Sequence, residues 1–395
     1  MSKRAKTKDS CNTSSVTCAT PSKRVRYVPF ARGFKPRNEN ARNNAIGFGK
    51  ASDIPKEFSS CSGTSSSSSV EFFKPIPQPT SQDDWLAQYD EDGQTYKQFL
   101  EENPWFSHRK VKYINQKFCS DGKTIQDKYP DGKVCIIQLG EFDQPINFSD
   151  LVDYASRFLC LPVEALPPLE LEVKDGKVTL VDDPIKRGAM ASRTGRSTGR
   201  IKKSELHSRY NAKTGHLQLR VDSVLSKLRM QIPANALCLI ALTTLDLYGD
   251  ASDLFVAGMA AGNQRVAVFS LRRYDPSLTF CKEYWYKLHP SSTPVSAQEK
   301  SRLLLQRSCK LVVHEISHLL GVDHCVFFDC CMNGSGHLME DFRQPMHLCP
   351  VDLRKLHTLV GFDIRARYKS LLEFYRQHGL EEEEEWVQQR LEYLK

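Results

Sequence analysis

Apolar and polar residues follow periods that predict both strands and helices. Residues 169–173 and 177–181 alternate on either side of Asp175-Gly176, a residue pair that strongly favours a β-hairpin. Apolar runs predict further strands at 134–140, 236–247, 254–260 and 265–271. Helical spacing predicts helices at 150–159, 221–230, 351–359 and 364–378. This mixture predicts an α+β domain with a twisted mixed sheet over residues 131–378.

A long and mostly buried helix is also predicted from about residue 301, and it leads into the sequence HEISHLLGVDH at 314–324. Residues four apart share one helix face with Cβ atoms about 5–6 Å apart, so His314 and His318 can bind the same ion. Gly321 suits the left-handed turn that ends such a helix. The chain can then reverse and bring His324 back as a third ligand.

Three imidazole ligands leave one position of a tetrahedral zinc open for water, which distinguishes a catalytic site from a structural one. The pKa of water bound there falls to about 7. Glu315 lies about 100° further round the helix than His314, where it can act as general base and acid without being a ligand. The alternative is a core helix that carries histidines by chance. The extended spacing with Gly321 and His324 favours the metal site.

The residues after the third histidine carry a resemblance to a known family. Cys325 follows His324 at once, Cys330-Cys331-Met332 comes after four intervening residues, and Cys349-Pro-Val-Asp352 comes further on. This run resembles the archaemetzincins, zinc peptidases of the metzincin clan with the pattern HExxHxxGxxHC, four residues, CxM and then CxxC. The sequence has Asp352 where the family has its last cysteine.

The resemblance implies a zincin-like fold with an active-site helix, a Met-turn at Met332 and a second, structural zinc held by Cys325, Cys330 and Cys349. Asp352 could supply the fourth ligand, because carboxylate oxygens also bind zinc. A hard oxygen in place of a thiolate should weaken that site. The other candidates for the fourth ligand are water, Cys331, His337, His347 and His357.

Simpler structural interpretations exist for these residues. Buried cysteines can be small hydrophobes, which is the favoured interpretation for Cys331, and a methionine by itself is more often core filling. Four thiols close to three histidines favour metal binding for the other cysteines.

The resemblance implies hydrolysis of peptide bonds in a peptide or protein substrate. It also implies an edge strand, here Leu254–Ala260, that pairs with bound peptide by β-augmentation; an ordinary protected edge is the alternative. A different class of function is a zinc-stabilised scaffold that binds partners through basic tails and catalyses little. Glu315 distinguishes the two, because only hydrolysis needs a carboxylate there.

The remaining segments are predicted from composition. Residues 1–70 are polar, with basic clusters and a serine run, and are predicted to be disordered. Residues 71–130 form an N-terminal extension with short helices, in which tryptophans act as docking anchors. Residues 186–203 are a basic, flexible insertion, and residues 379–395 form a charged terminal helix with a solvated face.

Composition agrees with an intracellular enzyme. The 395 residues include 13 cysteines and carry a net charge of +8. We expect no signal peptide, no membrane span and a reducing compartment, cytoplasmic or nuclear. The basic clusters could be a nuclear-import or nucleic-acid patch. A solvated tail is the favoured interpretation, because aromatic residues are sparse there and no nucleic-acid module follows. The sequence leaves the oligomeric state and the natural substrate open.

Overall fold

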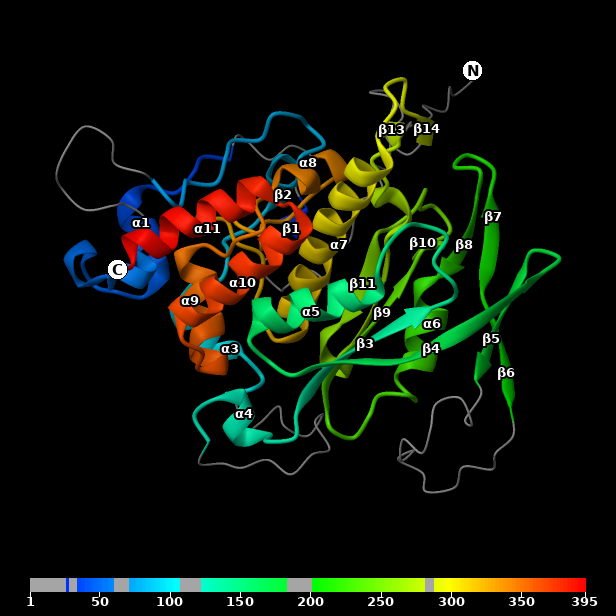
Figure 1. The fold of residues 1–395 in the computed structure, drawn as a ribbon, viewed down its shortest axis with the longest axis horizontal. Helices are drawn as coiled ribbons and strands as arrows, with labels where there is room; N and C mark the ends of the chain where they lie inside the picture. The colour runs from blue at the N-terminus through cyan, green and yellow to red at the C-terminus, as the bar shows by residue number, and fades with distance from the viewer. Residues whose placement is uncertain (1–25, 28–33, 60–70, 107–121, 183–200, 281–287) are drawn as a thin grey trace, which may run out of the picture.

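The computed structural model describes residues 26–27, 34–59, 71–106, 122–182, 201–280 and 288–395 (Figure 1). The prediction of disorder for residues 1–25, 28–33 and 60–70 and the prediction of a flexible insertion over 186–200 concern residues outside the described ranges. No helix of the described segments combines the length and the apolar character that crossing a membrane requires.

A mixed seven-stranded sheet forms the centre of the molecule, in the order β11-β12-β9-β3-β4-β5-β6. Pairing is parallel from β12 through β9 and β3 to β4, and antiparallel for β11, β5 and β6. The strands are β3 Lys133–Leu139, β4 Val163–Lys174, β5 Lys177–Asp182, β6 Lys202–Leu206, β9 Ala236–Thr243, β11 Gly258–Ala261 and β12 Val266–Ser270. The predicted α+β class with a mixed sheet is confirmed, and an antiparallel strand stands at its edge.

Smaller sheets and eleven α-helices complete the described fold. The other strands are β1 Arg26–Tyr27 with β2 Tyr89–Asp90, β7 Ser208–Asn211 with β8 His216–Arg220 and β10 Asp246–Tyr248, and β13 Leu278–Phe280 with β14 Leu288–Pro290. The helices are α1 Glu39–Ile46, α2 Trp85–Gln88, α3 Tyr96–Glu102, α4 Ile125–Lys128, α5 Phe148–Leu159, α6 Val221–Leu228, α7 Ala297–Leu319, α8 Leu338–Arg343, α9 Pro350–Val360, α10 Ile364–His378 and α11 Glu381–Tyr393.

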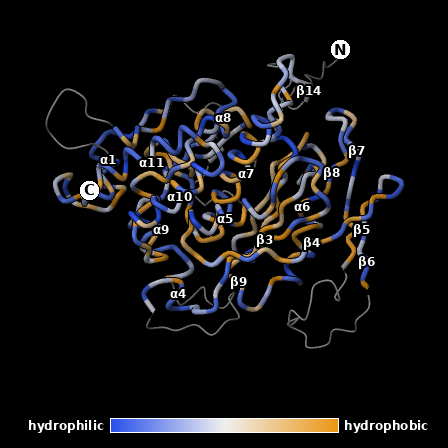
Figure 2. Tube along the Cα trace, viewed as in Figure 1, coloured by the Kyte–Doolittle hydropathy of each residue, from blue (hydrophilic) through white to orange (hydrophobic). Residues whose placement is uncertain are grey.

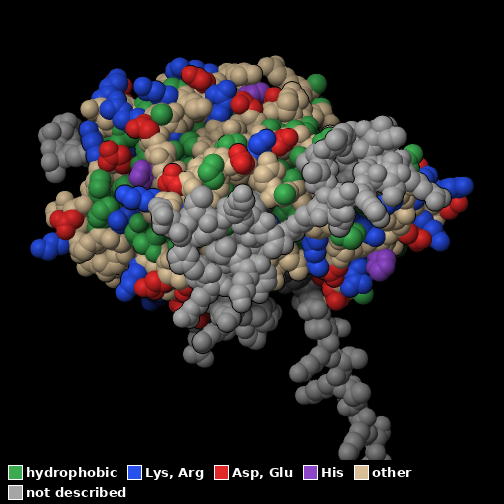
Figure 3. Space-filling view, turned by 90° about the horizontal axis from the view of Figure 1, so that it is seen from below, with side chains coloured by type: hydrophobic (Ala, Val, Ile, Leu, Met, Phe, Trp, Pro, Cys, Tyr) green, Lys and Arg blue, Asp and Glu red, His purple; other side chains and the backbone are tan. Residues whose placement is uncertain are grey.

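Each face of the sheet packs against its own helices. Alternate residues of β3 point to opposite faces, so Val134 and Ile136 join the core under α5 and α7, whereas Cys135 and Ile137 join the core under α6. Hydrophobic residues concentrate along the central strands and the inner faces of these helices (Figure 2). On the face seen in Figure 3, Lys and Arg side chains are interspersed with Asp and Glu, as is typical of a solvated surface.

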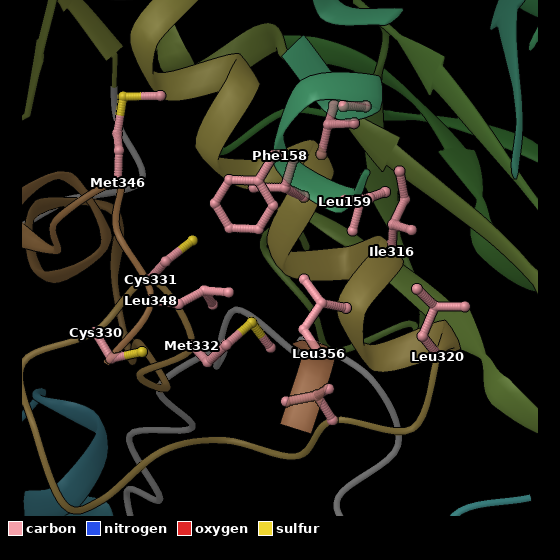
Figure 4. Packing of buried hydrophobic residues seen from close by; sticks show 14 of the residues in the cluster. Phe158, Leu159, Ile316, Leu320, Cys330, Cys331, Met332, Met346, Leu348 and Leu356 are labelled. Atoms are coloured by element: carbon pink, nitrogen blue, oxygen red, sulfur yellow. The ribbon is translucent and has the colours of Figure 1, made fainter. Parts of the chain in front are cut away.

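Helix α7 crosses the sheet and carries the histidine motif. Its N-cap Ser296 accepts a hydrogen bond from the Glu299 backbone N–H, and the helix then runs for 23 residues. Its second half is buried on nearly all sides, because α5, the sheet and the chain around Cys330 surround it. Figure 4 shows this packing, with Ile316 and Leu320 on the α7 side and Met332 and Leu348 facing them. The predicted buried helix is confirmed.

Three predictions about elements were wrong in part. The run 236–247 is two strands, because the chain leaves the large sheet after Thr243 and β10 pairs with β8 instead. Strand β11 begins at Gly258, later than predicted. Lys202 and Lys203, predicted to lie in a flexible insertion, belong to β6, where Lys203 pairs with Glu172.

Both ends of the described chain fold onto the body of the protein. Residues 34–59, predicted to be disordered, contain α1 and two 3-10 turns; α1 and the turn at 56–58 pack on α9, with Ala45, Ile46 and Phe58 buried. Helix α11 packs along α10, so only part of it faces solvent; its Arg390 is fully buried. A charged helix with a solvated face was predicted here, and the structure has a helix whose opposite face is buried.

The small sheet is fixed to the rest of the molecule by a buried ion pair. Arg273 binds Asp246 through two hydrogen bonds of 2.8 and 2.9 Å, and the side chains are 3% and 1% exposed. We expect Asp246→Ala to lower the free energy of unfolding by about 3–5 kcal/mol, because the guanidinium stays buried without its carboxylate. Chemical denaturation measures this loss. Glu172→Ala, which removes the exposed pair with Lys203, should cost less than about 1 kcal/mol; equal losses in the two variants would contradict this account.

Candidate metal centres

The end of α7 brings three imidazoles together. His314 and His318 lie one turn apart on the helix, and Gly321 adopts φ +89° where the helix ends. A Cβ at Gly321 would come within 2.5 Å of Asn103 Nδ2, so both the backbone angle and the close approach require glycine. The chain turns back and places His324 beside the other two, with one ring nitrogen of each within 4.8 Å of the others. The predicted positions of these four residues agree with the structure.

Hydrogen bonds at the Nδ1 atoms orient the three imidazole rings. His314 Nδ1 lies 2.7 Å from the carbonyl oxygen of Cys331, and His318 Nδ1 lies 2.7 Å from that of Val322. A carbonyl can only accept, so each Nδ1 carries the proton and each neutral ring keeps its lone pair at Nε2. The two Nε2 atoms are 3.0 Å apart, and Nε2 of His324 is buried with no hydrogen-bond partner among the described residues. Three lone pairs that converge in this way suit a metal cation.

The surroundings keep two of the rings neutral. Burial, together with the neighbouring His324, lowers the pKa of His314 to about 3. Burial and the other two imidazoles likewise lower the pKa of His318 well below its usual value. For His324, burial also lowers the pKa, but the carboxylate of Glu91 outweighs this effect and raises it overall. Neutral imidazole is the form that binds metal, so His314 and His318 are ready for an ion, whereas a protonated His324 must first lose the proton at Nε2.

Glu315 follows His314 directly on α7 and is fully buried. The helix turns by about 100° per residue, so this carboxylate borders the histidine group without lying on the ligand face. Glu315 is not among the residues whose ligand atoms form this group, and its role as general base and acid stays a prediction.

A second group of ligand atoms lies immediately after the histidines. The thiols of Cys325, Cys330 and Cys349 and one carboxylate oxygen of Asp352 lie within 4.8 Å of one another, all buried. Asp352 Oδ2 is 3.3 Å from the sulfurs of both Cys330 and Cys349, and the sulfurs of Cys325 and Cys349 are 3.6 Å apart. These three soft sulfurs and one oxygen are a donor set that suits zinc.

The carboxylate of Asp352 has a second, buried partner. Its other oxygen, Oδ1, accepts a hydrogen bond of 2.8 Å from Lys355 Nζ, and both side chains are fully buried. Burial raises the pKa of Asp352 to about 6, although the Lys355 ammonium opposes the rise. Burial also raises the pKa of the Cys325 thiol, but hydrogen bonds from Cys330 and Cys349 outweigh this effect and bring it well below its usual value. Burial and the hydrogen bond with Cys325 raise the pKa of the Cys330 and Cys349 thiols well above its usual value. The negative charge of the cluster therefore lies on Cys325 and Asp352, beside the Lys355 ammonium.

The profile of peptidase family M54 matches residues 288–358, which contain all seven residues of the two groups. The chain carries an M54 segment. Its resemblance to the archaemetzincins is confirmed by several relatives. The archaemetzincin-2 of Rattus norvegicus is 36% identical over 176 residues, which are 42% of this chain and 49% of that protein. The archaemetzincin-2 of Homo sapiens is 37% identical over 174 residues, which are 42% of this chain and 48% of that protein.

The match therefore spans about half the length of these archaemetzincin-2 relatives. A solved structure is also similar, the archaemetzincin of Archaeoglobus fulgidus in complex with malonate. It is 20% identical, covers 56% of this chain and 99% of its own, and has a TM-score of 0.35. The resemblance to the archaemetzincins depends on the sequence matches and on the residues of the M54 segment.

The structure distinguishes among the candidates for the fourth ligand of the cysteine group. Asp352 is the one that lies with the three cysteines. His337 binds Asp84, and His347 stacks on Trp386 with ring centroids 4.0 Å apart. His357 packs edge-on against Phe58 and Phe362, and the remaining thiol, Cys331, is buried in the hydrophobic core.

Met332 is fully buried and lies two residues after Cys330 of the cysteine group. Its backbone carbonyl accepts a hydrogen bond of 2.8 Å from the Cys325 backbone N–H, which ties the turn at Met332 to the chain after His324. Its side chain lies in the core with Cys331 and Leu348 (Figure 4). The role of a Met-turn for this residue stays a prediction.

Sequence reasoning missed the contribution of the N-terminal extension to the histidine group. Trp85 packs edge-on against the ring of His324, with centroids 5.1 Å apart, and Glu91 binds its Nδ1. Asn103 Nδ2 donates to the carbonyl of Leu320 at the end of α7. Two tryptophans, Trp85 and Trp105, are buried anchors, as predicted, but no spacing in the sequence identifies their partners.

Proposed function

We propose that this chain is a zinc-dependent peptidase that hydrolyses peptide bonds, with His314, His318 and His324 holding the catalytic zinc. The convergence of three Nε2 lone pairs beside a buried glutamate carries the proposal. The M54 segment supports it. In a zinc-dependent peptidase each of these residues has a role: the three imidazoles bind the zinc, and the glutamate carries the proton.

The reaction needs one proton to move from water to the leaving amine. Zinc, when bound, supplies a Lewis acid that polarises the scissile carbonyl and lowers the pKa of water to about 7. Glu315 accepts the proton of the attacking water as the oxygen bonds to the carbonyl carbon. It then donates that proton to the amide nitrogen as the C–N bond breaks, which leaves a carboxylate product and a free amine. The buried position of Glu315 keeps bulk water from competing for the proton.

Strand β11 offers a place for an extended substrate. It is the last strand of the large sheet on its side among the described strands, and it runs antiparallel to β12. We infer that a peptide adds to this edge by backbone hydrogen bonds, which gives affinity with little dependence on sequence.

We propose that the cysteine group holds a second, structural zinc, with Asp352 as its fourth ligand. The three cysteines are free thiols, and thiols stay reduced and free to bind metal in the cytosol and nucleus. We therefore also propose an intracellular location, cytoplasmic or nuclear. Fluorescence imaging of the tagged protein tests it, and a secretory pattern would contradict it.

Incubation of the zinc-loaded protein with an unbiased peptide mixture tests the proposed activity. We expect new peptide ends by mass spectrometry, their loss after removal of metal with a chelator, and their return with added zinc. A scaffold that only binds partners predicts no cleavage under any of these conditions. Zinc-loaded protein that leaves the mixture intact would therefore favour the scaffold.

A further inference from the structure

Glu91, from the N-terminal extension, reaches into the histidine group. Its Oε1 lies 3.1 Å from Nδ1 of His324, and the two residues are 233 positions apart in the sequence. Their side chains are 6% and 9% exposed. His314 and His318 use backbone carbonyls at the same ring position. The third imidazole is thus oriented by a full negative charge, where the other two have a peptide dipole.

The second carboxylate oxygen of Glu91 does not share the hydrogen bond to His324. Oε2 is buried and has no hydrogen-bond partner among the described residues. Burying a carboxylate that is incompletely paired costs free energy, and a neutral acceptor would hold the ring equally well. A divalent cation on the far side of the imidazole offsets this cost, because the carboxylate makes the ring a stronger ligand.

Close packing fixes the segment that carries Glu91. A Cβ at Gly334 would come within 2.5 Å of the Trp85 indole, so the chain leaves just enough room for that ring. The Trp85 backbone N–H donates to Glu340 Oε2 at 2.8 Å, and His337 Nε2 lies 2.8 Å from Asp84 Oδ1. These contacts join the extension to the chain between Cys330 and Cys349.

Two more residues of the extension bind the turn between α7 and His324. The Gln94 side chain donates to the carbonyl of Gly321 and accepts from the backbone N–H of Asp323, at 3.3 and 3.2 Å. Asn103 Nδ2 donates to the Leu320 carbonyl at 2.8 Å. The extension therefore holds both the third histidine and the turn that delivers it.

We propose that Glu91 is a positioning residue of the histidine metal centre, which forms a carboxylate–histidine–metal triad with His324. Residues 83–103 thereby belong to this centre, although they lie outside the M54 segment. The inference depends on the proposed binding of metal by the three histidines. It adds a residue that the histidine motif does not contain.

The affinity of the full-length protein for zinc tests the role of Glu91, measured by competition with a chelating dye. Glu91→Gln keeps the shape and an oxygen acceptor but removes the charge. We expect it to weaken zinc binding at the histidines by about 10–100-fold, with little change in the melting temperature of the metal-free protein. Asp92→Asn, which alters a neighbouring carboxylate of 80% exposure, should leave the affinity unchanged.

Cobalt gives a second measurement that a merely structural contact would not affect. Cobalt in place of zinc gives d–d bands at both sites, and the cysteine site adds thiolate-to-cobalt charge-transfer bands. We expect Glu91→Gln to change the d–d bands that the histidine site contributes and to leave the charge-transfer bands as in the parent. A Glu91→Gln protein with the parent's zinc affinity and d–d bands would overturn the role of Glu91 alone. A parent protein that binds no metal at the histidines would overturn the proposed function as well.

Discussion

Replacing Glu315 with glutamine should reduce peptide hydrolysis by about 10²–10⁴-fold while zinc stays bound. The amide keeps the size of the side chain but cannot accept a proton, and general acid–base catalysis contributes about this factor. The three imidazoles are separate side chains, so the affinity for zinc should change little. Initial rates on a peptide found to be cleaved, with zinc content measured on the same sample, give both numbers.

Glu299→Gln is a matched control for this variant. Glu299 lies in the first turn of the same helix and pairs with Arg302, far along the chain from the histidines. We expect its rate to equal that of the parent. A Glu315→Gln protein that cleaves within a few-fold of the parent would show that the carboxylate is not the proton carrier, even if zinc is required.

Removing one thiol of the cysteine group should change both metal content and stability. We expect Cys349→Ala to lower the zinc content from about two ions per chain to about one, because it leaves two thiols and Asp352. Binding of a structural zinc contributes directly to folding free energy, so the variant should lose several kcal/mol of stability. Elemental analysis and thermal unfolding measure the two effects.

Two further variants separate the ligands of this group from their surroundings. Cys331→Ala removes a buried thiol outside the group, so it should keep both zinc ions and lose only packing energy. Asp352→Cys restores a fourth thiolate and should tighten binding, because zinc prefers soft ligands here. A parent protein with one zinc per chain, unchanged in Cys349→Ala, would contradict the second metal centre.

The elements with strong local signals could be predicted from the sequence. The hairpin forms where Asp175 and Gly176 both take positive φ, as the pair predicts. Helix α7 and the turn at Gly321 follow from spacing within 24 residues, so the histidine group could be assembled without knowledge of the rest of the fold. Cys325, Cys330 and Cys349 could also be predicted as one ligand group, but from the resemblance to the archaemetzincins and not from helix geometry.

Elements that depend on distant partners could not be predicted. Residues 34–59 have few apolar residues and no clear period, and they fold because α9 offers Ile46 and Phe58 a surface. The apolar run 236–247 gives no sign that the chain leaves the large sheet after Thr243. In the structure, Asp246 lies in β10, where it binds Arg273 and Gln218. The contact of Glu91 with His324 joins residues 233 positions apart, and no local pattern encodes it.

Crystals of the zinc-loaded protein, measured above and below the zinc absorption edge, test the metal centre most directly. The account predicts an anomalous peak about 2.0–2.1 Å from Nε2 of His314, His318 and His324. Absence of a peak among these three rings, or rings whose Nε2 atoms point away from one another, would contradict it.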